Sequence, residues 1–232
     1  MATLAALAPL VAASLLGSAR GSGTASHEVR EVPKFHAVRV AAGIRVALEI
    51  GPQRPLELSG DDNILPLVVA EVLDGELRIH FGLGENISTR QAVEVRVAAP
   101  QLDSVVAEGG SRVGGQVAKV ESLSIDASGG ATVELSGLDA AALSAAGSGG
   151  ATLTLSGHTT RLALDLSGGS IVRAERLEAG EVRLHGSGGC TGEITAREQV
   201  SGELSGGSRL RIRGKAHTRV STSGGSSVGY DG

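Results

Sequence analysis

Ser128-Gly129-Gly130-Ala131, Ser148-Gly149-Gly150-Ala151 and Ser167-Gly168-Gly169-Ser170 are three copies of one short motif, and this motif decides the fold. Seven Gly-Gly pairs follow one another at steps of 18 to 20 residues, six of them after serine, with first glycines at Gly109, Gly129, Gly149, Gly168, Gly188, Gly206 and Gly224; Gly114-Gly115 lies outside this series. A repeat of this length is typical of a solenoid, in which each repeat is one coil and neighbouring coils share a core. The sequence therefore predicts a solenoid with coils of 18–20 residues.

The residues on both sides of each Gly-Gly pair alternate between apolar and polar. The fourth position before the first glycine holds Val105, Ile125, Ala145, Leu164, Leu184, Gly202 and Val220. The third position after the second glycine holds Val113, Val133, Leu153, Val172, Gly192, Leu210 and Val228. A period of two within each coil indicates strands with one face toward a core. We therefore predict an all-β parallel β-helix, whose coil is a strand, a Gly-Gly corner, a second strand and a looser return.

The glycine pairs themselves have a structural explanation. Stacked coils lie about 4.8 Å apart, so equivalent corners superpose. Glycine adopts a positive φ without strain and carries no Cβ to clash with the next coil. Phosphate-binding glycine loops occur singly between a strand and a helix, whereas these seven pairs lie between strands. We interpret the pairs as corners of the fold and not as a phosphate site.

The first part of the chain divides into three predicted segments. Residues 4–16 are rich in Ala and Leu, and the small-x-small patterns Gly17-Ser18-Ala19 and Gly23-Thr24-Ala25 follow. A membrane anchor needs about 20 apolar residues, so the run predicts a signal peptide over residues 1–25; the alternative is a buried N-terminal helix. Residues 26–33 are polar and are predicted to be a linker. The β-helical domain covers residues 34–228, with a less regular part at 34–101 and the regular repeats at 102–228.

Composition narrows the classes of function. The aromatic residues are Phe35, Phe81 and Tyr230, so the core must be aliphatic. A net charge of −4 gives no overall basic field for nucleic acid or anionic lipid. The single cysteine, Cys190, excludes an intrachain disulfide. It stands directly after a Gly-Gly pair, in a column of Ala and Ser, and is predicted to be a small buried side chain rather than a nucleophile.

These features together resemble the head GIN-domain family of "putative autotransporter adhesins", a bacterial domain. The likeness covers residues 32–226 and is carried by the Ser-Gly-Gly turns and by segments 35–40, 43–46, 60–65 and 74–79. The resemblance implies a right-handed parallel β-helix, a periplasmic, cell-surface or secreted location, and an adhesive role without catalytic residues. Arg45 departs from the pattern, because the family's name implies Asn after Gly-Ile.

No catalytic, cofactor-binding or metal-binding residue is predicted. Asp61, Asp62 and Asn63 carry oxygen atoms that suit calcium, but adjacent side chains of this kind more often form a solvated turn. Asp126, Asp165 and Glu203 share one outward column, three positions before the first glycine and two coils apart. Paired carboxylates keep a polysaccharide-active β-helix enzyme open as an alternative, although no aromatic platform for a sugar ring accompanies them.

The sequence therefore predicts an exported, non-enzymatic binding module or adhesin of a bacterial envelope. The expected partner is an extracellular or envelope ligand, a glycan or a protein, and not nucleic acid. After removal of the signal we expect no stable membrane anchor. A second alternative is a self-associating scaffold, because the open ends of a solenoid invite end-to-end stacking, and its flat faces invite face-to-face contact.

Overall fold

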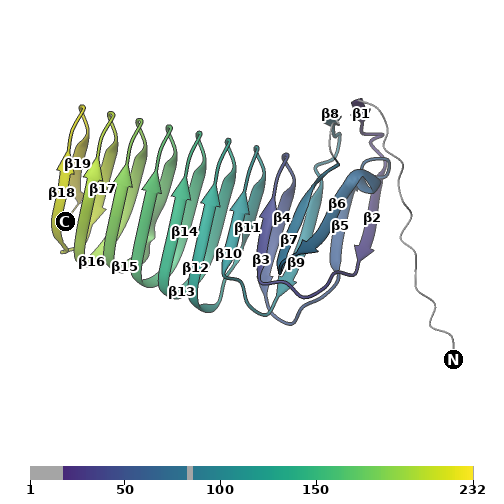
Figure 1. The fold of residues 1–232 in the computed structure, drawn as a ribbon, viewed down its shortest axis with the longest axis horizontal. Helices are drawn as coiled ribbons and strands as arrows, with labels where there is room; N and C mark the ends of the chain where they lie inside the picture. Colours follow the sequence, from purple (N-terminus) through teal and green to yellow (C-terminus); the bar gives the residue numbers. More distant parts are fainter. Residues whose placement is uncertain (1–17, 83–85, 232) are drawn as a thin grey trace.

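A computed structural model describes residues 18–82 and 86–231, and Figure 1 shows them as one long stack of coils. One sheet of 17 strands makes up the stack, while β1 (Ser18–Arg20) and β8 (Asn86–Ser88) pair separately. The predicted all-β parallel β-helix is confirmed. Among the described residues, the helical structure consists of the short 3-10 turn η1 (Leu65–Leu67). The apolar run of the predicted signal, residues 4–16, lies outside the described residues.

Within those ranges, no helix has the length and apolar character needed to cross a membrane.

The regular coils stack in the predicted register. Ile125 lies beside Val105 of the coil before and Ala145 of the coil after, and Val133 lies in the same way between Val113 and Leu153. Both predicted inward columns are buried along nearly the whole stack and become half-exposed in the last coil. The coils are formed by β10 (Ser104–Ala107), β11 (Arg112–Gln116), β12 (Lys119–Ala127), β13 (Thr132–Gly147), β14 (Thr152–Leu166), β15 (Ile171–Gly186), β16 (Thr191–Leu204), β17 (Arg209–Arg213), β18 (His217–Thr222) and β19 (Ser227–Asp231).

Each Gly-Gly corner is a tight turn, and glycine is required at its two positions for different reasons. Ala131 N donates to Ser128 O at 3.1 Å, and Gly129 and Gly130 have φ of 61° and 78°, as in a type I′ turn. The first glycine of each pair also touches the preceding corner. A Cβ on Gly149 would lie 3.1 Å from Gly129 N, whereas one on Gly150 would meet no described atom within 4 Å. The first glycine is therefore needed for both conformation and space, and the second for conformation alone.

The return part of each coil is more ordered than the sequence suggested. The backbone ladder continues through it, so that β13, β15 and β16 run for 14–16 residues, and Asp139 lies beside His158. The register shifts between Leu135 and Leu138, where Gly137 has a φ of 68°. Ser136 and Gly137 have no partner in β14 at this point, and the pairing resumes with Leu138 beside Gly157.

The first coil of the chain is inserted between later ones. It comprises β3 (Ala37–Val40) and β4 (Arg45–Ile50), joined by a corner in which Ala42 has a φ of 60°. On one side it pairs with β7 (Glu76–Phe81) and β9 (Glu94–Ala99), and on the other with β10 and β11. Figure 1 shows this purple coil between the blue and teal strands. Chain order and spatial order therefore differ at this end.

Antiparallel strands close the N-terminal end of the stack, and we call this region the cap. β5 (Leu56–Asp61) pairs antiparallel with β9 and also with β2 (Ala25–Arg30). Most of the segment predicted to be a linker, 26–33, is therefore part of the sheet. Its strand character was missed because β2 is an outermost strand, where half-buried Ser26, Glu28 and Arg30 replace an apolar column. Arg30 donates to the carbonyl of Leu65 at 2.8 Å.

Residues 62–73 contain a short helical turn followed by a strand. Pro66 lies in the first turn of η1, and β6 (Val68–Leu73) follows directly. A hairpin then joins β6 to β7, with φ of 50° at Asp74 and 79° at Gly75. This is the turn that the Asp-Gly pair predicts.

Candidate binding surface

Cys190 lies in the interior of the coils. Cys190 is 1% exposed, and its thiol donates to the hydroxyl of Ser208 at 3.2 Å. Its prediction as a small buried residue is confirmed. The strands that precede the corners form what we call the pre-corner sheet, made of residues 104–107, 122–127, 142–147, 161–166, 181–186, 199–204 and 217–222.

A shallow trough crosses the outward face of the pre-corner sheet. Small side chains make its floor, and larger charged ones stand at its ends, so the sheet is hollowed by a cavity of about 330 Å³. Asp103 lies at the end nearer the cap, and Arg161, Glu181 and Arg183 lie at the other end. Because the floor belongs to consecutive strands of one sheet, its shape is fixed by the backbone. The floor residues are Ser122, Ser124, Ala142, Ser144 and Ala163.

The predicted carboxylate column exists and contains a histidine. Asp126, Asp165 and Glu203 lie two coils apart, with Ala146 between the first two and His185 between the last two. All three carboxylates and His185 are exposed, and they line hollows of about 260 and 360 Å³ beside the corners. Sequence reasoning missed that His185 belongs to this column, although it lies three residues before Gly188, which is the position that defines the column.

Within residues 18–82 and 86–231, no three His, Cys, Asp or Glu side chains gather closely enough to hold a metal ion.

A matched network of charges occupies the cap end of the same sheet. Arg39 donates to Glu76 at 3.1 Å and to Glu108 at 2.9 Å, and Arg78 donates to Glu76 at 2.7 Å. Burial alone would raise the pKa of Glu76, but the hydrogen bonds from both arginines outweigh it and hold that pKa below its ordinary value. The bond to Glu76 raises the pKa of Arg39. These charges are paired with one another, and none of the four residues lines the trough.

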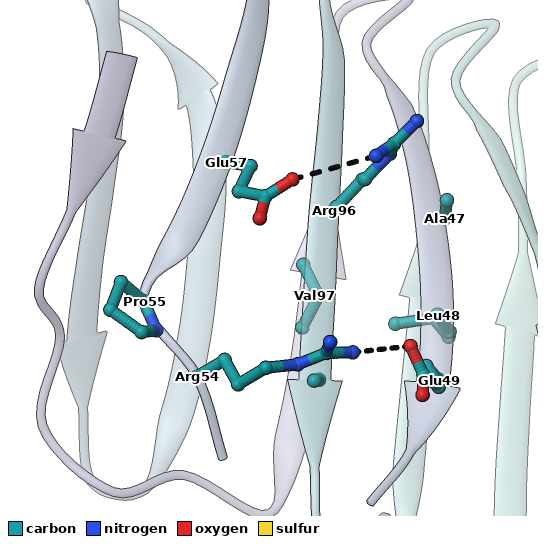
Figure 2. A pocket seen from close by; sticks show the side chains of 9 residues that line it. Ala47, Leu48, Glu49, Arg54, Pro55, Glu57, Arg96 and Val97 are labelled. Atoms are coloured by element: carbon teal, nitrogen blue, oxygen red, sulfur yellow. Dashed lines mark hydrogen bonds and ion pairs between the residues drawn. The ribbon is translucent and has the colours of Figure 1, made fainter. Parts of the chain in front are cut away.

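A second hollow, of about 390 Å³, lies where the cap meets the first coil (Figure 2). The buried residues Val97 and Ala98 are among those that line it, and two ion pairs cross it. Arg54 reaches over to Glu49, and Arg96 lies 3.5 Å from Glu57. Every partner is more than half exposed, so each pair adds little stability. The hollow joins strands β4, β5 and β9 and has no unmatched arginine, which makes it a weaker candidate than the trough.

The turn considered for calcium is a backbone anchor. Asp61 is fully buried, and its carboxylate accepts from Gly23 N at 2.8 Å, Arg90 N at 2.8 Å and Gln91 N at 3.0 Å. Burial alone would raise the pKa of Asp61, but these backbone donors outweigh it and lower the pKa below its ordinary value. Both carboxylate oxygens are therefore engaged by the protein. Sequence could not show this, because the donors lie 29 to 38 residues away.

Solved structures share this fold at low sequence identity. A "putative adhesin" from Bacteroides fragilis matches with a TM-score of 0.83 at 18% identity, over 92% of this chain and 100% of that one. A "putative lipid binding protein" from Parabacteroides distasonis gives 0.76 at 14% identity, over 93% and 100%. A "putative adhesin" from Parabacteroides merdae gives 0.70 at 18%, over 93% and 99%. No curated protein matches the chain.

A family model agrees with the resemblance seen in the sequence. It covers residues 34–216, which is most of the chain. At the position where the family's name implies Asn, Arg45 lies outward and exposed between Glu94 and Arg112. The chain belongs to the family described as "Putative auto-transporter adhesin, head GIN domain".

Proposed function

We propose that this chain is an exported, non-enzymatic binding module of the bacterial envelope, and that its trough on the pre-corner sheet holds a glycan. The observation that carries the proposal is the trough itself, a hollow of about 330 Å³ on a rigid sheet, with a floor of small side chains and charged residues at both ends. Adhesion is the role that the names of the family and of two structural neighbours favour.

The chemistry of the trough suits a hydroxyl-rich polymer. Arg161 and Arg183 offer fork-shaped sets of donors, Asp103 and Glu181 offer carboxylate acceptors, and the serine hydroxyls of the floor can do both. Ser104, Ser124, Ser144 and Ala163 form one outward column on four consecutive coils, which spans about 14 Å at a spacing near 4.8 Å. An extended chain lying along the stack therefore meets the same kind of contact at each coil.

The absence of an enzymatic role is supported by the setting of the carboxylates. Asp126, Asp165 and Glu203 are exposed on a flat sheet. A glycosidase instead needs one carboxyl kept protonated by its surroundings, opposite a second across the scissile bond.

Binding to a glycan panel tests the proposal. The protein is immobilised and probed with purified bacterial and host glycans, matrix proteins as a separate arm, and polysaccharide digestion is followed in parallel. Ser144→Arg fills the floor of the trough and is expected to weaken glycan binding at least about tenfold, which is 1.4 kcal/mol. Ser136→Arg is the matched control, because it makes the same change on the same strand, β13, outside the trough.

Four results would overturn parts of the proposal. Equal binding by both variants removes the trough as the site. Binding to proteins, with no binding to glycans, would show that the ligand is a protein and not a glycan. Release of sugar products would show that the chain is an enzyme. Recovery of the wild-type chain only from the cytoplasm, in full length or as filaments, contradicts export and favours a scaffold.

A further inference from the structure

Five residues ahead of β2 are fastened across the cap, and we call residues 20–24 the N-terminal strap. Gly21 N donates to Ser88 O at 2.8 Å, and the side-chain amide of Asn63 donates to Arg20 O at 2.9 Å. Ser22 N in turn donates to Oδ1 of Asn63 at 2.9 Å. The side chain of Asn63 in the cap therefore binds the backbone of the strap at two residues, Arg20 and Ser22, and the strap lies against the cap.

The strap also completes the anchor at Asp61. Gly23 N supplies one of the three donors to the buried carboxylate, and Asp62 N donates to Thr24 O at 3.0 Å. The fit is close, since a Cβ on Gly21 would lie 2.1 Å from Oδ2 of Asp61. Without the strap, the carboxylate of Asp61, which is buried in the complete structure, would lose one of its three donors, and a buried polar group that lacks a partner is costly. Asn63, which is exposed, would lose both of its partners in the strap.

The two small-x-small patterns of the sequence fall on opposite sides of the strap. Cleavage after Ala25 would remove it entirely, together with the pairing of Ala25 with Asp61. Cleavage after Ala19 would keep all of the strap's bonds and remove only Ser18 and Ala19 from their pairing with Asn86 and Ile87. The sequence alone does not distinguish the cleavage sites after Ala19 and after Ala25. In the structure, only cleavage after Ala19 keeps the strap.

We infer that the export signal is removed at the Ala19–Arg20 bond, by a peptidase that recognises small residues at the cleavage position. Water adds across the peptide bond, so that Ala19 carries the new carboxylate and Arg20 becomes the new amino terminus. The pattern that ends at Ala25 then reflects the small residues that the turn of the strap requires, and it is not a cleavage signal. This inference rests on the proposed export of the chain.

The test is the mass and N-terminal sequence of the full-length chain after expression in a bacterial host and recovery outside the cytoplasm. The expected product begins at Arg20. In parallel, Ala19→Gln is expected to accumulate uncleaved precursor, while the matched change Ala25→Gln leaves processing as in the wild type.

An exported product that begins at Ser26 overturns the assignment of the cleavage site but leaves export intact. Normal processing of Ala19→Gln together with blocked processing of Ala25→Gln overturns it in the same way. A full-length chain confined to the cytoplasm overturns both the cleavage and the proposed export, so the two failures are distinguishable.

Discussion

The cap and the regular coils are built on different principles, although they share one sheet. In the coils, backbone ladders and glycine corners repeat, and few side chains bond to anything specific. In the cap, single side chains hold distant segments: Asp61 binds backbone groups at residues 23, 90 and 91, and Arg30 binds the carbonyls of Leu65 and Val68. The fold of the coils is therefore specified by small residues and by the regular spacing of the repeat, whereas the fold of the cap is specified by individual polar contacts.

This difference predicts how each region fails. A local change in a coil affects that coil and its two neighbours, because each repeat contacts only the adjacent ones. A change at a polar anchor of the cap releases several segments at once.

Asp61→Ala is expected to give the largest fall in melting temperature, because it removes the buried carboxylate that accepts hydrogen bonds from the backbone N–H groups of residues 23, 90 and 91. Asp62→Ala is the matched control, since the side chain of Asp62 is exposed and its bond is to the hydroxyl of Ser22. Thermal denaturation followed by circular dichroism measures both. Equal losses would show that the cap is not held by the buried carboxylate.

The same anchor predicts a dependence on pH. The folded-state pKa of Asp61 is lowered, so its stabilisation is present at neutral pH and is lost as the pH falls below about 4, the ordinary carboxyl range, toward the folded value. Urea denaturation between pH 7 and pH 3 should show a shallower loss for Asp61→Asn than for the wild type. Parallel curves would contradict the assignment.

Gly115→Ala tests the junction of the first coil with the regular coils, where β11 meets β4. A Cβ there would lie 2.2 Å from the carbonyl oxygen of Leu48, so a backbone must move. We expect a cost of about 3 kcal/mol, or a melting temperature lower by about 6–12 °C. At Gly114 the nearest atom to a Cβ lies 3.9 Å away, and Gly114→Ala should leave stability unchanged or slightly raised. If the two variants melt together, the close packing at this junction is wrong.

The corner glycines should differ within one pair. Gly150→Asn needs only the positive φ that asparagine tolerates, and should cost about 1 kcal/mol or less. Gly149→Asn adds a Cβ 3.1 Å from Gly129 N and should cost about 2–3 kcal/mol. Denaturant titration of both variants resolves this difference. The reverse order would mean that corner stacking does not constrain the first glycine.

Ala42→Gly should give the smallest effect and the opposite sign. Ala42 takes the place of the first glycine in the first coil and has a φ of 60°. Relief of that strain, about 1–2 kcal/mol, exceeds the extra backbone entropy of glycine, so the variant should gain about 0.5–1 kcal/mol. A chemical denaturation midpoint that falls instead would show that the Cβ of Ala42 makes a contact worth keeping.

The sequence carried most of the information for the coils and little of it for the cap. The offset from each Gly-Gly pair predicted which residues face inward, from Val105 to Val220, and the column shared by Asp126, Asp165 and Glu203, because a solenoid turns period into position. The trough was not predicted, since it depends on which small side chains become neighbours on successive coils. The roles of Asp61 and residues 25–30 were missed because their partners are distant and lack any period.

The inserted first coil has a consequence for how the chain assembles. Residues 37–50 are synthesised before every strand that pairs with them in parallel, and both of their edges are later covered, one by residues 76–99 and the other by residues 104–116. This coil can therefore serve as a template from which strands are added in two directions. The capped end forms on one side of it, and the long series of repeats grows from the other.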